Sequence, residues 1–159
     1  MRERGVVAAE IEVEVPFHDV DLAQVVWHGH YLKYLENARW ALMDQLGFGL
    51  AAMLDSGFGW PVVDLQVKYL RMSRYADRLR VRAGLVDWES RLTIVYLLTD
   101  AVSGERVARA QTRQVAVDIA TGLLQFTSPP AFVACIEAAL ARAGISVFPP
   151  APGATAVNK

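Results

Sequence analysis

The side chains best suited to chemistry gather in one short segment, residues 17–39, which reads FHDVDLAQVVWHGHYLKYLENAR. Its carboxylates, Asp19 and Asp21, lie in an acidic turn, and Asp21 precedes His28 by seven residues, where an amphipathic helix opens. A helix N-terminus carries unpaired N–H groups and a partial positive charge. A carboxylate held near such donors combines a base or nucleophile with a stabiliser for a developing oxyanion, the two elements that acyl transfer requires.

This segment resembles the signature of the hot-dog-fold acyl-CoA thioesterases of the 4-hydroxybenzoyl-CoA thioesterase type. The matching positions are Phe17, Asp19, Asp21, Val25, Val26, Trp27, His28, Tyr31, Leu32, Tyr34, Glu36, Ala38 and Arg39. Residues 67–71 and 74–77 are similar to the family's central strand and the turn that follows it. The resemblance therefore spans about residues 10–140.

Two positions depart from the family pattern. Gln24 stands where the family usually has glycine, and His30 stands where a small or amide residue is commoner. Glycine at position 24 would tolerate a positive φ, whereas glutamine would not, so the geometry of this turn is left open.

The resemblance implies that Asp21 is the catalytic carboxylate, which would attack the thioester carbonyl to form a mixed anhydride or activate a water molecule. It also implies that the backbone N–H of His28 donates to the thioester oxygen, while the imidazole could orient water or substrate. Taken alone, Asp21 could instead cap a turn, and His28 could only cap the helix. Asp19 is better explained as a turn aspartate that binds nearby backbone N–H groups.

A second candidate region is basic. Lys68, Arg71, Arg74, Arg78, Arg80 and Arg82 fall within fifteen positions. We expect Lys68, Arg71 and Arg74 to bind the phosphate or pantetheine end of coenzyme A, and the alternative is a solvated strand edge. Tyr31 is ordinary core by its spacing, but the helix face of this fold also lines the acyl tunnel, so we expect Tyr31 to contact substrate as well.

Hydrophobic periodicity predicts the elements that must position these residues. Alternation predicts a strand over residues 10–17, with Ile11, Val13, Val15 and Phe17 on one face. A stripe at spacings of four and three predicts a helix over residues 30–46, capped by Gly47, with Glu36 and Arg39 as a surface or interface ion pair. Further strands are predicted at 62–70, 78–88, 91–100 and 105–119, a short helix or loop at 49–55, and a last helix from Pro129-Pro130.

This order predicts an α+β fold in which a five-stranded, mostly antiparallel sheet wraps around one long helix, and the resemblance names it a hot-dog fold. We expect one domain over residues 1–148 and a disordered Pro/Ala/Gly tail over 149–159. Long strand edges and 53% hydrophobic residues predict a homodimer or homotetramer. In the family the active site is shared between protomers, so Asp21 should face the partner's residues near 60–75.

Composition and sequence pattern argue against several classes of protein and of binding site. A net charge of −1 gives no field to attract nucleic acid, and the single Cys135 excludes an internal disulfide and a cysteine-based zinc site. The pair His28 and His30 has no convincing third ligand, so we expect neither a metal nor a cofactor. No apolar run of about 18 residues could span a membrane. The N-terminal residues lack the apolar core of a signal peptide, so we expect a cytoplasmic protein.

Three functions compete on these grounds. The first is hydrolysis of an acyl-CoA thioester to the free acid and coenzyme A. The second is hydrolysis of an acyl chain carried on an acyl-carrier protein in a biosynthetic pathway, which a basic patch would serve equally well. The third is a non-catalytic acyl-CoA-binding module of the same fold, against which Asp21 and His28 argue.

Overall fold

The elements follow the chain in the predicted order. The strands of the main sheet are β1 (Val7–Glu14), β3 (Val62–Tyr69), β4 (Arg78–Asp87), β5 (Leu92–Asp100) and β6 (Arg106–Gln114). The helices are α1 (Tyr31–Gln45), α2 (Leu50–Ser56) and α3 (Pro130–Arg142), with 3-10 turns η1 (Phe17–Asp19) and η2 (His28–His30). A second, two-stranded sheet joins β2 (Phe58–Gly59) to β7 (Val117–Asp118).

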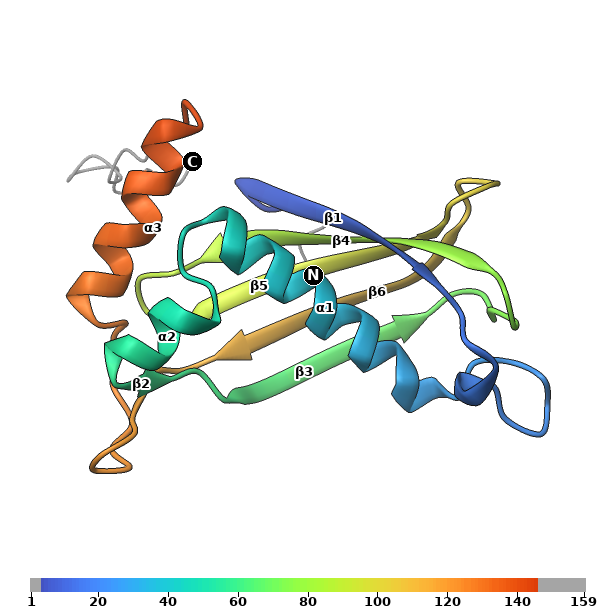
Figure 1. Cartoon of the computed structure of the whole chain (residues 1–159), viewed down its shortest axis with the longest axis horizontal. Helices are drawn as coiled ribbons and strands as arrows, with labels where there is room; N and C mark the ends of the chain where they lie inside the picture. The colour runs from blue at the N-terminus through green and yellow to red at the C-terminus, as the bar shows by residue number, and fades with distance from the viewer. Residues whose placement is uncertain (1–3, 146–159) are drawn as a thin grey trace, which may run out of the picture.

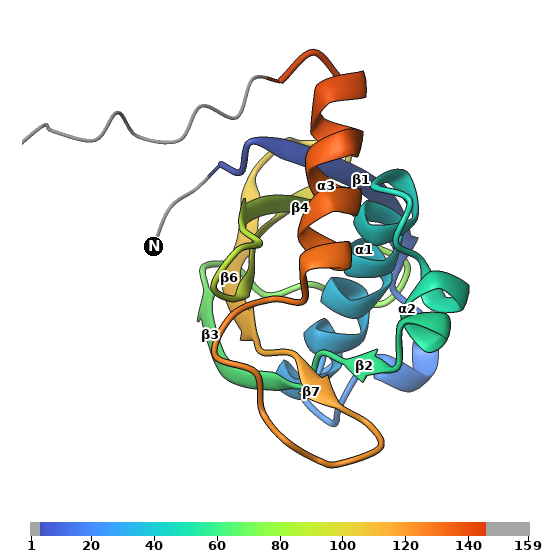
Figure 2. The ribbon, with the colours of Figure 1, turned by 90° about the vertical axis from the view of Figure 1, so that its left-hand side faces the viewer.

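The main sheet curves around α1. The computed structural model describes residues 4–145, and the predicted disordered tail at 149–159 lies outside them. The strand order is β1-β4-β5-β6-β3, and every neighbouring pair is antiparallel. Helix α1 crosses one face of the sheet (Figure 1), and the view along the sheet shows the strands bending around it (Figure 2). The predicted five-stranded sheet around one long helix is confirmed.

Two predicted strands are too long. Residues 105–119 alternate throughout, but β6 ends at Gln114, and residues 117–118 leave the main sheet to pair with β2. Alternation indicates which way side chains face and not which strand supplies the hydrogen bonds. It therefore could not show that residues 117–118 pair with a different strand. At the other end of the chain, β1 stops before Pro16, which has no N–H for a ladder. The chain then turns into η1, which leaves Phe17 75% exposed instead of facing the core.

Helix α1 is held on the sheet by the apolar stripe that its sequence predicts. The stripe residues Tyr31, Leu35, Ala38, Leu42 and Leu46 are at most 3% exposed. The helix packs mainly on β1 and β4, and the inward residues of β4 are fully buried: Leu79, Val81, Ala83 and Leu85. Gly47 follows the helix with φ 76, the left-handed conformation that suits a helix end. The direction in which the helix start points is therefore set by core packing.

A buried polar line adds a specific attachment between α1 and the sheet. Arg39 pairs with Glu36, as predicted, but the surface description is wrong for the arginine, whose side chain is 9% exposed against 48% for Glu36. Its Nη1 donates to Oε1 of the fully buried Gln114 at 2.8 Å. The line continues from Gln114 through Thr112 to the hydroxyl of Tyr96, whose pKa burial raises to about 12. A buried guanidinium is tolerated only with such partners, so this line favours one position of α1 on the sheet.

Strand β3 lies at an edge of the sheet and is poorly covered. Leu65, Val67 and Tyr69 alternate along one face of β3 and pair with buried positions of β6, yet Leu65 and Tyr69 remain 40% and 44% exposed. The reason is that α1 packs mainly on the opposite half of the sheet. An edge strand with half-exposed apolar residues is an unusual liability for a monomer.

Candidate active site

The loop between η1 and η2 holds Asp21 in a hydrogen-bonded turn. The Asp21 N–H donates to the Val25 carbonyl, and the Gln24 N–H donates to the Asp21 carbonyl, each at 2.9 Å. The carboxylate Oδ1 accepts the Ala23 N–H at 2.8 Å. Asp21 therefore does cap a turn, as the alternative predicted, but a second carboxylate oxygen is left for other partners, and the side chain is exposed.

Gln24 takes the conformation that glutamine was expected to avoid. Its φ is 62°, in the left-handed region where the family usually has glycine. The turn geometry is therefore preserved at a conformational cost, roughly 1–2 kcal/mol for an L-residue. A second non-glycine residue, Ala76, has φ 66° in the neighbouring turn at residues 73–77. That turn docks on the loop through the Val26 N–H, which donates to the Ser73 carbonyl at 2.8 Å.

Asp19 is not the backbone-binding turn aspartate that the sequence predicts. Its side chain is 1% exposed and accepts hydrogen bonds from the Lys33 ammonium and, at 2.6 Å, from the Tyr34 hydroxyl, both on α1. Burial raises the pKa of Asp19, but the bonds from Lys33 and Tyr34 outweigh it, so its pKa lies below the ordinary value. Because the shift is downward, the resulting stability is present above the ordinary pKa and is lost as pH falls through the lowered one.

The turn η2 opens α1 with two free donors. The Trp27 N–H donates to the Asp19 carbonyl at 3.0 Å, and the His30 N–H donates to the Trp27 carbonyl at 2.9 Å. Within residues 4–145, the N–H groups of His28 and Gly29 have no hydrogen-bond acceptor. A Cβ at Gly29 would lie 2.2 Å from the Trp27 ring, so any larger residue here would have to displace that half-exposed ring. This is the helix entrance that the sequence predicted as an oxyanion donor.

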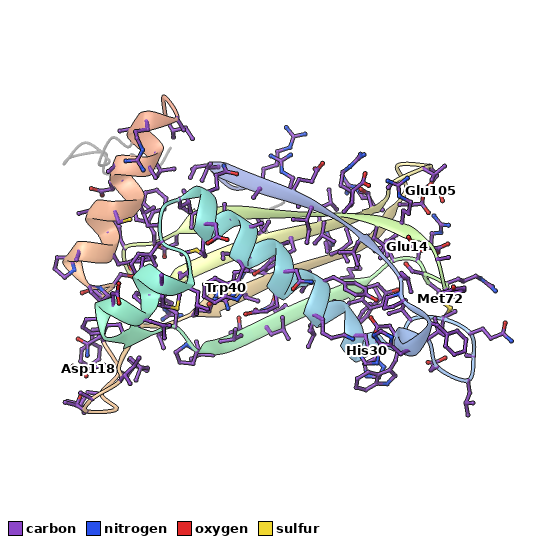
Figure 3. The ribbon with its side chains drawn as sticks, viewed as in Figure 1. Glu14, His30, Trp40, Met72, Glu105 and Asp118 are labelled. Carbon is purple, nitrogen blue, oxygen red and sulfur yellow. The ribbon has the colours of Figure 1, made fainter. Side chains whose placement is uncertain are left out.

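Asp21 lies between two hollows. The first has a volume of about 350 Å³ and is lined by Asp21, His28, Tyr31, Tyr69, Leu70 and Met72. The second, of about 910 Å³, is lined by Phe17, His18, Asp21, Gln24, Arg74 and Tyr75. Figure 3 shows that His30 and Met72, which mark this region, lie at the end of the molecule opposite Asp118. One carboxylate is therefore shared by both hollows, each of which has a largely apolar lining, and the second also contains Arg74.

The predicted site residues are only partly brought together. Asp21, His28, Tyr31 and Arg71 border the first hollow, and Arg74 borders the second. Arg71 is bound to Glu105 at 2.8 Å and lies 3.4 Å from Asp100, so its charge is already matched. Lys68 alternates with Tyr69 along β3, so it points to the other face of the sheet.

The rest of the basic run is also dispersed. Arg78 and Arg80 form ion pairs with Glu12 and Glu10 of the neighbouring β1. Sequence reasoning missed Tyr69, Met72 and Tyr75 as lining residues, although they lie beside the predicted basic residues. In the part of the chain that the structure describes, no group of three His, Cys, Asp or Glu side chains could hold a metal ion. No helix there is long and apolar enough to cross a membrane.

Comparisons with known proteins identify similar chains. The family model described as Thioesterase-like superfamily matches residues 15–148. A Synechocystis protein provisionally named an esterase is 32% identical over 128 residues, which cover 76% of this chain and 74% of that protein. The 1,4-dihydroxy-2-naphthoyl-CoA hydrolase of Thermosynechococcus vestitus is 32% identical over 66% of this chain and 73% of its own length. A crystal structure of a DHNA-CoA thioesterase from Staphylococcus aureus matches 88% of this chain and 97% of its own, with TM-score 0.74 and 24% identity.

The positive φ of Gln24 can be tested by Gln24→Gly. Glycine removes the left-handed penalty but loses more entropy on folding, so the free energy of unfolding should rise by about 0.5–1 kcal/mol. Gln24→Ala is the matched control, because it removes the side chain and keeps the penalty. Denaturant unfolding should show a higher midpoint for the glycine variant alone. Equal midpoints for the two variants would show that the conformation carries no net cost.

Proposed function

The chain belongs to the Thioesterase-like superfamily and is a thioester hydrolase, and from this premise we propose that its substrate is an acyl thioester of coenzyme A. The products are the free acid and coenzyme A. The observation that carries the proposal is the place of Asp21 between two hollows, the first of which is also bordered by His28 of the helix entrance. Among residues 4–145, one oxygen of the Asp21 carboxylate has no hydrogen-bond partner.

Asp21 and the helix entrance have different roles in the proposed reaction. A thioester carbonyl seated in the first hollow gains negative charge on its oxygen when it is attacked, and the His28 N–H stabilises that charge. Asp21 either attacks the carbonyl carbon, which releases the thiolate and leaves a mixed anhydride for water to cleave, or takes a proton from the attacking water. The thiolate leaves as the thiol of coenzyme A by either route.

The two hollows suit the two halves of the substrate. The first is lined by Tyr31, Tyr69, Leu70 and Met72, which offer aromatic and apolar contacts to an acyl group. The second carries Arg74, whose side chain is exposed and has no ion-pair partner among residues 4–145. An unpaired guanidinium beside the catalytic carboxylate suits a phosphate of coenzyme A. We therefore assign the coenzyme end to the second hollow.

Among the three predicted basic residues, Arg74 is the strongest phosphate ligand. Arg71 would first have to give up Glu105, and Lys68 points to the other face of β3. Arg71 borders the first hollow but is held by its carboxylate partners, whereas Lys68 would reach the substrate only around the strand edge or from a second protomer. A carrier-protein thioester is the alternative substrate, since its phosphopantetheine presents the same chemistry to Arg74.

We further propose that the working form is at least a homodimer, with a homotetramer as the larger alternative. The apolar residues on and just after the edge strand β3 are exposed on the same side as the first hollow: Leu65, Tyr69, Leu70 and Met72 are 40%, 44%, 44% and 72% exposed. Burial of such a surface against a second copy would remove the unpaired edge and close the hollow. The family resemblance adds that Asp21 would then face strand residues of the partner.

Asp21→Asn tests the catalytic assignment. Asparagine keeps a side-chain oxygen for the Ala23 N–H, so the turn should fold, but it is neither a base nor a nucleophile. Turnover of the best substrate from a panel of aliphatic, branched and aryl acyl-CoAs should fall on the order of 10²-fold or more, with thiol release as the readout. Asp55→Asn, an exposed carboxylate on α2, is the control and should stay within about two-fold. Full activity of a folded Asp21→Asn variant would refute the assignment.

Arg74→Gln tests the coenzyme end. We expect the KM for an acyl-CoA to rise about 3- to 10-fold with kcat nearly unchanged, because the phosphate contact is equal in ground and transition states. The loss should shrink at high salt and disappear for an acyl-N-acetylcysteamine, which has no phosphates. Arg80→Gln, whose charge is paired with β1, is the matched control. An equal loss on the truncated substrate would mean that Arg74 acts on the fold or the reacting centre instead.

The oligomer is tested by light scattering of the wild type and of Val63→Glu. The wild type should give at least twice the chain mass of 17.5 kDa. Val63 on β3 is 53% exposed, so a glutamate there is tolerated by the single chain but would bury a charge in an interface, and the measured mass should fall with activity. Val102→Glu, in an exposed turn, should change neither. A wild-type monomer at assay concentration would contradict the proposal.

A further inference from the structure

The edge strand reaches across to the helix entrance through one hydroxyl. Tyr69, the last residue of β3, donates its O–H to the His28 carbonyl at 2.7 Å. Its ring lies edge-on to the His28 ring, with centroids 6.5 Å apart, and 5.4 Å from the ring of Tyr31. Among residues 4–145 this is the hydrogen bond that ties η2 to the sheet, because the other bonds of the turn join it to Asp19, Trp27 and Tyr31.

That carbonyl belongs to the peptide unit whose N–H is Gly29. A trans peptide is planar, and its C=O and N–H point in opposite directions, so a bond that holds the His28 oxygen also fixes the direction of the Gly29 N–H. Gly29 has no side chain to resist rotation of this unit, and its own N–H has no acceptor within the described residues. Without Tyr69, the backbone between His28 and His30 would have one fewer restraint.

The same bond also strengthens the donor. Chains of hydrogen bonds polarise one another, so a hydroxyl that donates to a peptide oxygen makes the N–H of that peptide a better donor. Tyr69 is 44% exposed in the single chain, and the burial of its remaining surface raises its pKa above the ordinary value. The hydrogen bond from Tyr69 therefore both orients the His28–Gly29 peptide and polarises it.

We propose that Tyr69 is a positioning residue for thioester hydrolysis, which holds the His28–Gly29 peptide so that the donors of the helix entrance meet the developing oxyanion. This inference rests on the proposed function. It adds that the end of the edge strand fixes the backbone on the C-terminal side of His28, the residue of the helix entrance that borders the first hollow. The role of Tyr69 is thus distinct from that of an ordinary lining residue, which would contact substrate equally in ground and transition states.

Tyr69→Phe removes the hydroxyl and keeps the ring. Loss of a whole oxyanion donor costs roughly 10²–10³ in kcat, and a donor that remains but is less well held should cost less, about 10-fold. We expect that fall in kcat with KM within about two-fold, since the ground state makes little use of the donors. Tyr96→Phe is the matched control, because it also removes one tyrosine hydroxyl bond from the sheet but lies away from the site. It should lower the melting temperature and leave kcat unchanged.

Backbone hydrogen exchange gives a second readout that does not depend on activity. Tyr69→Phe should speed exchange of the amides from His28 to Tyr31, whereas Tyr96→Phe should not. Unchanged kcat, or a rise in KM alone, would overturn the inference. If the wild type hydrolyses no thioester on the panel, the proposed function fails, but hydrogen exchange still tests whether Tyr69 holds the turn. Exchange rates in Tyr69→Phe equal to those of the wild type would show that Tyr69 does not hold it.

Discussion

The site depends on one buried carboxylate. Asp19 binds Lys33 and Tyr34 with its side chain and the Trp27 N–H with its backbone oxygen, so it joins η1, η2 and the first turn of α1 at a single residue. The loop between those turns has little core of its own, and Leu22 at its tip is fully exposed. An ionised group this deeply buried is stable only with its partners in place. The contacts of Asp19 therefore hold the Asp21 loop at a set position relative to the helix entrance, although Asp19 itself borders neither hollow.

Much of the fold was readable from the sequence because packing against one helix imposes simple periods. The stripe of α1 and the alternating residues of β4 pack against each other, so the predicted helix and strand are both present, with residues such as Leu42 and Val81 buried. The pattern failed where a partner is missing or changes. Leu65 has the alternation of a covered strand but lies on an edge, and residues 117–118 keep their alternation while moving to another sheet. Periodicity indicates only which side of a strand each residue faces. It does not indicate whether that side is covered or which strand pairs with it, which explains both failures.

The candidate site was less predictable, for reasons of long-range geometry. Asp21 and His28, which the motif links, both border the first hollow, because their spacing is set by local turns. Sequence reasoning misjudged Asp19, whose partners lie 14 and 15 residues away on a helix. It also treated the basic run as one cluster, whereas a strand and a turn send Lys68, Arg71 and Arg74 to three different surroundings. Charges that are neighbours in sequence alternate across a sheet, and their partners come from other strands.

The two left-handed non-glycine residues have a consequence for binding, because Gln24 borders the second hollow and Ala76 lies in the turn that supplies Arg74 and Tyr75 to it. Gln24 and the turn of Ala76 keep non-glycine residues where glycine would be more comfortable, so each turn has few alternative conformations. A ligand that enters the hollow therefore meets walls that are already ordered, and little loop entropy is lost when it settles. Glycine at either position would relax the fold yet leave the mouth of the hollow more mobile before binding. In this chain, the same positive φ angles that strain the two turns also keep them ordered before a ligand binds.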